Sequence, residues 1–239
     1  ISGNAGVTIT TLTANKLATI DASNVTHGLV SFTTSALTSA ATIKGGADAN
    51  TIVATAATKS VSYIGQSKVD TITINNALDN NVSTGAGNDI IVLGTGANTV
   101  DAGEGNDTIT VNAGLSVVRG GTGADTLVIS GIAANGNTYV TFADPSVGDS
   151  IDLSALTTVA RADGTLGSKL TLGDTAAFGD YLSAATSTII ADAGASLVKW
   201  FQYSGNTYIV VDNTLAANTP DDTNSFENGI DSVVKLSLI

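Results

Sequence analysis

Three copies of one nine-residue pattern, spaced at a constant interval, constrain this chain more than any other feature of its sequence. The copies span residues 84–92, 102–110 and 120–128, and each approximates Gly-Gly-x-Gly-x-Asp-x-apolar-x. Their aspartates, Asp89, Asp107 and Asp125, follow one another at intervals of 18 residues. Two nonapeptides per period are what one full turn of a parallel β-roll requires. We therefore predict an all-β chain that folds as a right-handed parallel β-roll or β-helix solenoid.

The residue types in the pattern point to calcium. Glycines allow backbone angles that other residues avoid, and they let carbonyl oxygens approach a cation closely. Aspartate is a short hard-oxygen ligand, and calcium takes about six to eight oxygens at roughly 2.3–2.6 Å. One turn offers about half of these ligands, so the ion is expected between two stacked turns. Stacked aspartates repel one another without it, and calcium should therefore be part of the fold. The alternative is a Gly/Asp-rich array of loops that binds no metal.

The candidate metal site consists of oxygens from the three copies, with the best positions between the first and second copies and between the second and third. Its residues are Thr84, Ala86, Gly87, Asp89, Ala102, Gly103, Glu104, Gly105, Asp107, Gly120, Gly121, Thr122, Gly123 and Asp125. The apolar residues two positions after the aspartates are expected to face the core; they are Ile91, Ile109 and Leu127.

Composition narrows the function classes. The 239 residues carry a formal charge of −12, from 21 acidic and 9 basic residues, and all but two of the acids are aspartate. This balance argues against binding to nucleic acid or to an anionic membrane surface. Cysteine is absent, so disulfides and thiol chemistry are excluded. A secreted chain of this size without disulfides needs another stabilising cross-link, and bound calcium would provide it. No stretch reaches 18 apolar residues, so we expect no membrane insertion. The N-terminus resembles neither a start methionine nor a signal peptide, and we expect the C-terminal part of a longer protein.

The repeat is looser outside the three copies. Residues 1–44 are rich in β-branched residues, and strands are expected there. Asn50 stands where aspartate is expected, and Asp70 lacks the paired glycines. On the opposite side of each turn, Asn98 and Ser116 replace aspartate, so one edge should hold metal well and the other poorly. Asp21 is interpreted as a turn cap. The sequence does not decide whether Asp21, Asp70, Asp101, Asp149 and Asp152 are ligands.

The period stops near Asp144, so we divide the chain into a solenoid at 1–147 and a C-terminal capping and secretion subdomain at 148–239. Residues 174–187 are predicted to form a helix with Asp174 as its N-cap, and its apolar residues should be core. Two apolar runs flank the turn at 204–206, which predicts a β-hairpin at 198–212. A strand is predicted at the C-terminus. Because a solenoid must cover its last turn, this subdomain is expected to act as a cap.

The nonapeptides resemble those of RTX proteins, which Gram-negative bacteria export by type I secretion. Together with the Thr/Ala-rich first part, the segment 149–154, the hairpin and the segment 231–236, they resemble the C-terminal halves of RTX surface-layer proteins. The resemblance implies a calcium-stabilised roll, transit through an ABC transporter, and calcium-dependent self-assembly into a lattice on the cell surface. Calcium-dependent folding would also suit this export route, because the chain would stay unfolded at low cytosolic calcium and fold outside the cell.

An enzyme is the main competing class. The chain holds one histidine, His27, which we interpret as a turn residue, so it contains neither His-Glu-x-x-His nor a three-histidine zinc site. It also lacks the Gly-x-Ser-x-Gly elbow of lipases. We predict a structural, non-catalytic protein. The alternative is the C-terminal RTX secretion and folding module of a larger secreted enzyme or adhesin. An ice-binding solenoid is disfavoured because the threonines follow no regular Thr-x-Thr ladder.

Overall fold

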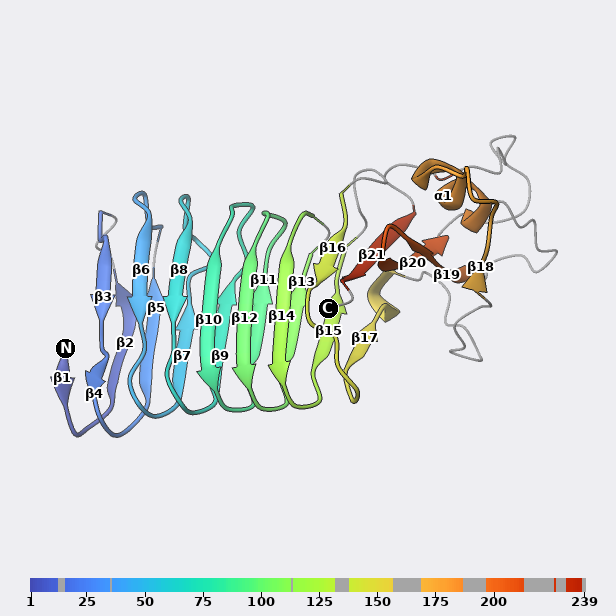
Figure 1. The fold of residues 1–239 in the computed structure, drawn as a ribbon. Coiled ribbons are helices and arrows are strands. Elements are labelled where there is room, and N and C mark those ends of the chain that lie inside the picture. Colours follow the sequence, from blue (N-terminus) through green and yellow to red (C-terminus); the bar gives the residue numbers. More distant parts are fainter. Residues whose placement is uncertain are drawn as a thin grey trace.

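A parallel β-solenoid of about seven coils forms most of the molecule, and a smaller C-terminal part adjoins its last coil (Figure 1). The structure is a computed structural model that describes residues 1–12, 16–34, 36–112, 114–131, 138–156, 169–186, 197–212, 226 and 231–237. Each coil places one strand in each of two sheets. The all-β solenoid predicted from the repeat is confirmed.

One face of the solenoid is an eight-stranded parallel sheet with the order β17-β15-β13-β11-β9-β7-β5-β2. Its strands are β2 (Val7–Leu12), β5 (Val30–Thr34), β7 (Asn50–Val53), β9 (Asp70–Ile74), β11 (Ile90–Leu93), β13 (Thr108–Val111), β15 (Thr126–Ile129) and β17 (Ser150–Asp152). β17 lies beyond the expected boundary at 147 and still pairs with β15.

The other face belongs to an eleven-stranded sheet with the order β18-β19-β20-β21-β16-β14-β12-β10-β8-β6-β3. Its strands are β3 (Thr19–Asp21), β6 (Ala41–Lys44), β8 (Val61–Ile64), β10 (Asn81–Ala86), β12 (Thr99–Glu104), β14 (Val117–Thr122), β16 (Val140–Phe142), β18 (Lys169–Leu170), β19 (Leu197–Tyr203), β20 (Asn206–Asp212) and β21 (Ser232–Ser237). A short pair, β1 (Ser2–Gly3) and β4 (Asn24–Val25), accompanies the first coil.

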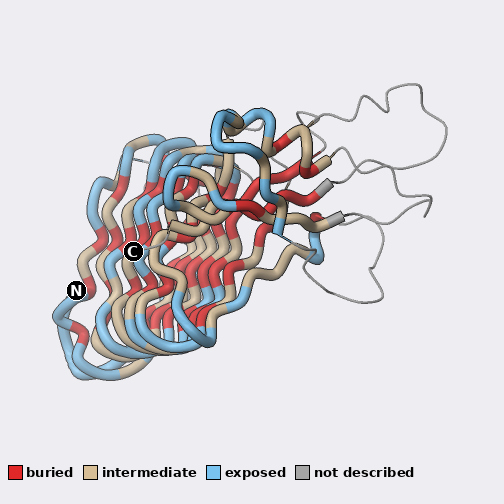
Figure 2. The backbone as a smooth tube through the Cα atoms, turned by 45° about the vertical axis from the view of Figure 1, so that its right-hand side comes forward, coloured by how far each residue is buried: buried red, intermediate tan, exposed pale blue. Residues whose placement is uncertain are grey.

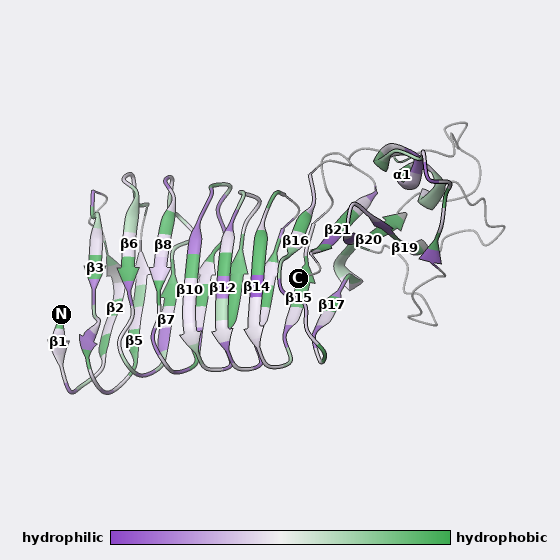
Figure 3. Ribbon diagram, viewed as in Figure 1, coloured by the Kyte–Doolittle hydropathy of each residue, from purple (hydrophilic) through white to green (hydrophobic). Residues whose placement is uncertain are grey.

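The core is a continuous column between the two sheets, because alternate residues of every strand point inward. Buried and exposed positions alternate along the coils, and the strands carry alternating apolar and polar bands (Figures 2 and 3). Ile91, Ile109 and Leu127 are fully buried, as their place in the repeat predicts. At roughly 1.5–3 kcal/mol for each buried aliphatic side chain, this column is the main stabilising element of the coils.

The C-terminal part is built on the same sheet as the solenoid. β21 pairs in parallel with β16 and antiparallel with β20, which pairs antiparallel with β19. The predicted hairpin is confirmed, with its turn at Ser204 and Gly205, both at positive φ. A short 3₁₀ helix, η1 (Ser154–Leu156), follows β17.

One α-helix occurs among the described residues, α1 (Phe178–Thr186), and it is shorter than predicted. The N-cap assigned to Asp174 is wrong: the helix starts four residues later, where the Asp180 carboxylate accepts the N–H of Ala177. Leu182 and Ala185 are buried, and Phe178 packs on Tyr208 with ring centroids 4.8 Å apart, so the core role of these residues is confirmed. No described helix has the length and apolar character needed to span a membrane.

Candidate metal centre

A ladder of carboxylates runs along one edge of the solenoid, the lower edge in Figure 1, where the chain passes from the eleven-stranded to the eight-stranded sheet. We call it the acidic edge; its members are Asp70, Asp89, Asp107, Asp125 and Asp149, and Asn50 precedes them. Each aspartate accepts, through Oδ1, the backbone N–H of the member one coil earlier, at 2.7–3.1 Å. The ladder thus joins six successive coils by one repeated hydrogen bond.

The second carboxylate oxygen distinguishes the middle of the ladder from its ends. Oδ2 of Asp89, Asp107 and Asp125 is buried without a hydrogen-bond partner. At the ends, Oδ2 of Asp70 accepts the Tyr63 hydroxyl at 2.8 Å, and Oδ2 of Asp149 accepts the Ser146 N–H at 2.7 Å. A buried carboxylate oxygen without a donor costs more than the roughly 1–3 kcal/mol of a neutral group. A cation bound next to these three Oδ2 atoms would remove this cost.

Backbone carbonyls converge on the same gaps between coils. A Cβ atom added to Gly103 would lie 1.9 Å from the Gly85 oxygen, and one added to Gly105 would lie 1.9 Å from the Gly87 oxygen, so these two carbonyls point toward the next coil. The Ala102 oxygen accepts the Thr84 hydroxyl at 2.9 Å, so it points back.

The same geometry repeats one coil further on. The oxygens of Gly103 and Gly105 lie 1.9 Å from Cβ positions on Gly121 and Gly123. In the returning direction, the carbonyls of Glu104 and Thr122 accept the N–H groups of Gly87 and Gly105 at 2.7 and 2.8 Å. A carbonyl oxygen has two lone pairs and can accept such a bond while it also ligates a cation. Carbonyls from both sides, with the carboxylates, form the hard-oxygen set that calcium takes.

Glycine is required at two positions of each turn. Gly85, Gly103 and Gly121 have φ of 102°, 106° and 95°, and Gly87, Gly105 and Gly123 have φ of 143°, 132° and 136°. These angles are strained for other residues, and the carbonyl of the preceding coil fills the space of a Cβ atom. The backbone that aims carbonyls between coils is therefore available only to glycine at these positions.

Burial disfavours the ionised form of three carboxylates in the ladder, Asp70, Asp107 and Asp125. The pKa of Asp107 is raised to about 6, mainly by burial and in part by the carboxylates of Asp89 and Asp125, although the hydrogen bond from the Asp89 N–H opposes the shift. Burial likewise raises the pKa of Asp70 to about 6, although hydrogen bonds from Asn50 and Tyr63 oppose the shift. The pKa of Asp125 is raised for the same main reason, with Asp149 and Asp144 adding to it. A bound cation would reverse these shifts by favouring the carboxylates.

The opposite edge makes similar contacts between coils, but its glycines do not have positive φ and its side chains are different. Asn98 Oδ1 accepts the N–H of Asn80 at 3.1 Å, as the aspartates accept theirs. Asn98 Nδ2 then donates to the carbonyls of Gly94 and Gly96 at 3.0 and 2.9 Å. The Ser116 hydroxyl donates to Gly96 O as well, at 3.1 Å. On this edge, which we call the amide edge, nitrogen donors satisfy the carbonyls. The side chains that replace aspartate on this edge therefore bond to the backbone of the turn.

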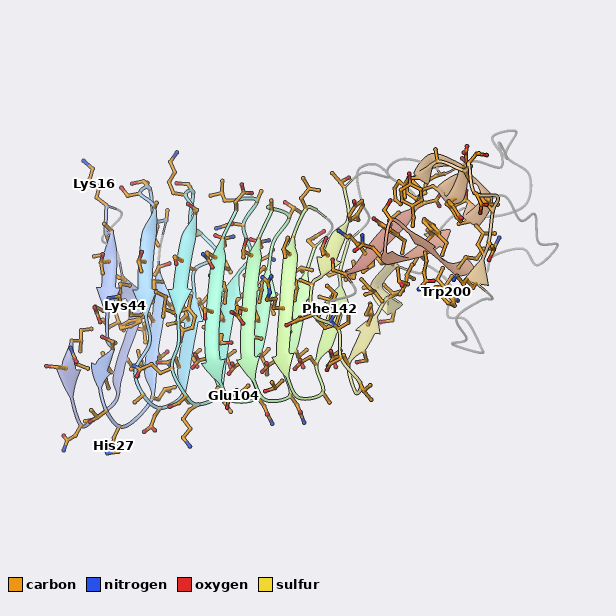
Figure 4. The ribbon with its side chains drawn as sticks, viewed as in Figure 1. Lys16, His27, Lys44, Glu104, Phe142 and Trp200 are labelled. Carbon is orange, nitrogen blue, oxygen red and sulfur yellow. The ribbon has the colours of Figure 1, made fainter. Side chains whose placement is uncertain are left out.

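The residues predicted from the pattern lie together on the acidic edge, in register across β10, β12 and β14. The predicted set of ligand residues omitted Gly85, whose carbonyl also points into the gap between the first and second copies. Gly85 occupies the glycine position two residues before Gly87, and this position in the pattern could have indicated its role. Figure 4 shows Glu104 and the exposed His27 on this edge. Only the carbonyl of Glu104 faces a neighbouring coil, because it accepts the Gly87 N–H while the residue itself is exposed.

The structure places the five undecided aspartates differently. Asp21 accepts the N–H and hydroxyl of Ser23 and pairs with Lys44 at 3.1 Å, as expected of a turn cap, and the Ser23 hydrogen bonds lower its pKa. Asp101 lies on the outer face of β12, beside Arg119 of β14. Asp152 accepts the Ser154 N–H, and hydrogen bonds from Ser154 lower its pKa.

The remaining two, Asp70 and Asp149, are the ends of the ladder, where both carboxylate oxygens accept hydrogen bonds. Asp144, which the sequence did not single out, adds a further cap there: its carboxylate accepts the N–H groups of Gly120 and Gly121 at 3.0 and 3.2 Å. No group of three or more His, Cys, Asp or Glu side chains converges in the described part of the chain. This agrees with a site that takes most of its oxygens from the backbone.

Fold and site together define a parallel β-roll with a carboxylate and carbonyl ladder along one edge. Comparison with known proteins identifies the repeat: residues 75–109 and 101–128 each match a family model that describes four copies of the RTX calcium-binding nonapeptide repeat. No curated protein matches the chain. The chain therefore carries RTX repeats, and these repeats bind calcium. Proteins with such repeats are typically type I secretion substrates, which is consistent with an extracellular location.

Proposed function

We propose that this chain is the assembly region of a secreted, non-catalytic surface-layer protein. It passes the ABC transporter unfolded, folds when it meets calcium, and binds copies of itself through the outer face of the eight-stranded sheet. The observation that carries the proposal is the absence of charge on that face over its seven strands from β2 to β15.

Two rows of side chains make up this neutral face. Hydroxyl residues dominate the first row, which runs in register as Thr8, Ser31, Thr51, Thr71, Ile90, Thr108, Thr126 and Ser150. The second row alternates threonine and valine and ends in an acid: Thr33, Val53, Thr73, Val92, Thr110, Val128 and Asp152. Threonines therefore recur in two rows across the coils, but among these eight strands only β2, β9 and β13 contain Thr-x-Thr, so the ladder is not regular.

Charge favours a second copy as the partner of this face. The chain carries −12 overall, so two copies repel one another wherever their acids meet. The outer face of the eleven-stranded sheet carries Asp21, Lys44, Asp101 and Arg119 in one row. On the neutral face, only Asp152 at the last strand bears a charge. Copies can approach there with the least repulsion and desolvation cost.

The size of the face favours a lattice contact over an isolated dimer. Eight strands at about 4.8 Å and two outward residues per strand give roughly 400 Å² on each copy. Stable pairwise interfaces bury about 800 Å² per partner. A contact of half that size is weak alone, and it becomes effective when each copy makes several contacts in an array.

The test uses matched lysine variants. Thr108→Lys places a charge in the neutral face, and Thr99→Lys makes the same change at an exposed position of β12 on the opposite sheet. In millimolar calcium, the wild type and Thr99→Lys should grow into large particles by light scattering, with a lattice visible by negative stain. Thr108→Lys should fold equally well by circular dichroism and remain small. A wild type that folds with calcium and stays monomeric would contradict the proposal and favour a secretion module of a larger protein.

The rows of threonine favour a second candidate function, ice binding. Thr8, Thr71 and Thr108 each begin a Thr-Ile-Thr segment whose two hydroxyl residues lie on the neutral face. Regular hydroxyl and methyl groups on a rigid sheet can order water. Thermal hysteresis of the calcium-loaded protein, lost in Thr108→Lys and kept in Thr99→Lys, would support this function. No hysteresis in the wild type would exclude it.

A further inference from the structure

The first turn of the acidic edge differs from the calcium-binding turns at two positions. Asn50 stands where the later turns have aspartate. Tyr63, on β8, occupies the inward position that holds Val82, Val100 and Val118 in the following coils. Both replacements bring a hydrogen-bond donor to a place where the later turns have none.

The amide nitrogen of Asn50 is surrounded by oxygens from two coils. Nδ2 donates to the carbonyls of Gly46 and Asp48 at 3.2 and 2.9 Å, and to Oδ1 of Asp70 at 2.7 Å. Gly46 and Asp48 precede Asn50 by four and two residues, as Gly85 and Gly87 precede Asp89. The amide therefore lies among the same oxygens that would surround a cation in the calcium-binding turns.

The hydroxyl of Tyr63 satisfies the remaining oxygen. Tyr63 is 1% exposed, and its hydroxyl donates to Oδ2 of Asp70 at 2.8 Å. In the next coils, valine offers no donor, and Oδ2 of the aspartate is unpartnered. A Cβ atom on Gly45 would lie 2.5 Å from the Tyr63 hydroxyl, so glycine at this position makes room for it.

We propose that Asn50 and Tyr63 together replace a calcium ion, so that the coils before Asp70 form a metal-independent seed for the calcium-dependent turns. Both carboxylate oxygens of Asp70 have donors, and the seed has its own core, with Phe32, Ile43, Ile52 and Tyr63 fully buried. In a solenoid each coil is stabilised mainly by its neighbours, so a preformed coil lowers the cost of ordering the next one. Calcium then extends an existing structure.

Hydrogen exchange measured by mass spectrometry on the full chain tests the seed. In EDTA, peptides from β6 and β7 should keep protection within about threefold of the calcium-loaded state, while peptides from β11 to β14 should exchange at least about a hundredfold faster. Equal loss of protection in both regions on chelation would overturn the proposal. Lattice growth is not part of this readout, so the result is independent of the proposed assembly.

Substitutions test the replacement of the ion. Asn50→Asp should make β6 and β7 calcium-dependent, losing protection in EDTA and regaining it in calcium, and titration calorimetry should count one additional calcium per chain. Asn81→Asp, an exposed change on β10, is the matched control and should alter neither. Tyr63→Phe keeps the ring and removes the donor, so the seed should lose at least about tenfold protection in EDTA. Unchanged calcium stoichiometry in a folded Asn50→Asp, or unchanged protection in Tyr63→Phe, would refute the assignment.

Discussion

The acidic edge and the amide edge make similar contacts between coils, but they differ in turn backbone and in one side-chain atom: the paired glycines of the acidic turns have positive φ, whereas Gly94 and Gly96 do not. On both edges, glycine-bearing turns direct carbonyls toward the next coil, and a side-chain Oδ1 accepts the N–H of the previous coil. At Asn98 the second side-chain atom is a nitrogen that donates to Gly94 and Gly96. At Asp107 it is a buried oxygen without a donor. An amide therefore satisfies the carbonyls of its turn with its own N–H groups, whereas a carboxylate leaves these oxygens to be neutralised by a cation.

Removing calcium should have the largest effect on this comparison. Three buried, unpartnered carboxylate oxygens at a cost of at least about 1–3 kcal/mol each approach the whole stability of a typical domain. In EDTA at neutral pH, we expect most of the β-sheet signal from β10 to β15 to be lost, and calcium should restore it. Circular dichroism during a calcium titration measures this. A spectrum that chelation leaves unchanged would contradict the calcium dependence of the acidic edge.

Asp107→Asn should give the acidic edge the chemistry of the amide edge at one turn. An amide can donate to the carbonyls of Gly103 and Gly105, as Asn98 does to its own turn. We expect one calcium fewer, a metal-free state more stable by about 1–3 kcal/mol, and a calcium-loaded state that loses roughly 2–3 kcal/mol of linked binding energy. Calorimetry and urea unfolding with and without EDTA measure these changes. Asp101→Asn, on the outer face of β12, is the control and should change neither quantity.

The sequence predicted the calcium edge because its evidence is local. Asp89 directly precedes β11 and Ile91 lies in it, so a nine-residue pattern indicates which residue faces the metal site and which packs in the core. The contact of Tyr63 with Asp70 could not be predicted from the sequence. It depends on how far the side chain of an inward-facing residue on β8 reaches toward the turn that carries Asp70. The coil steps of 20, 19, 18, 18 and 24 residues likewise concealed the threonine rows. The parallel pairing of β16 with β21 joins segments about ninety residues apart, beyond any local signal.

Asn98→Asp makes the reverse exchange, on the amide edge. The new carboxylate would face the oxygens of Gly94 and Gly96, and the Ser116 hydroxyl, which lies beside Asn98 in this structure, donates to the Gly96 oxygen. We expect a loss of about 1–3 kcal/mol in EDTA, partly recovered in millimolar calcium. Urea unfolding in both conditions measures it, with Asn81→Asp as the exposed control. If calcium restores nothing, carboxylate chemistry alone does not make a site, and the paired positive-φ glycines of the acidic edge are also needed.

A change of pH should have the smallest effect, and its sign should reverse with calcium. In the metal-free protein, burial raises the pKa of Asp107 to about 6, above its unfolded value of about 3.9. The folded state therefore holds more protons between these values, so its stability is greatest at low pH and is lost as the pH rises through 6. From pH 7.5 to 5 in EDTA, the free energy of unfolding should rise by about 1–2 kcal/mol for this group. Asp70, whose pKa is also raised to about 6, contributes a similar amount, and Asp125 contributes in the same direction, so Asp107→Asn should remove only part of the slope. With calcium bound, protons compete with the ion, and the same acidification should destabilise the roll. Urea titrations at the two pH values, with and without EDTA, measure both slopes, and slopes of equal sign would contradict a cation site on the acidic edge.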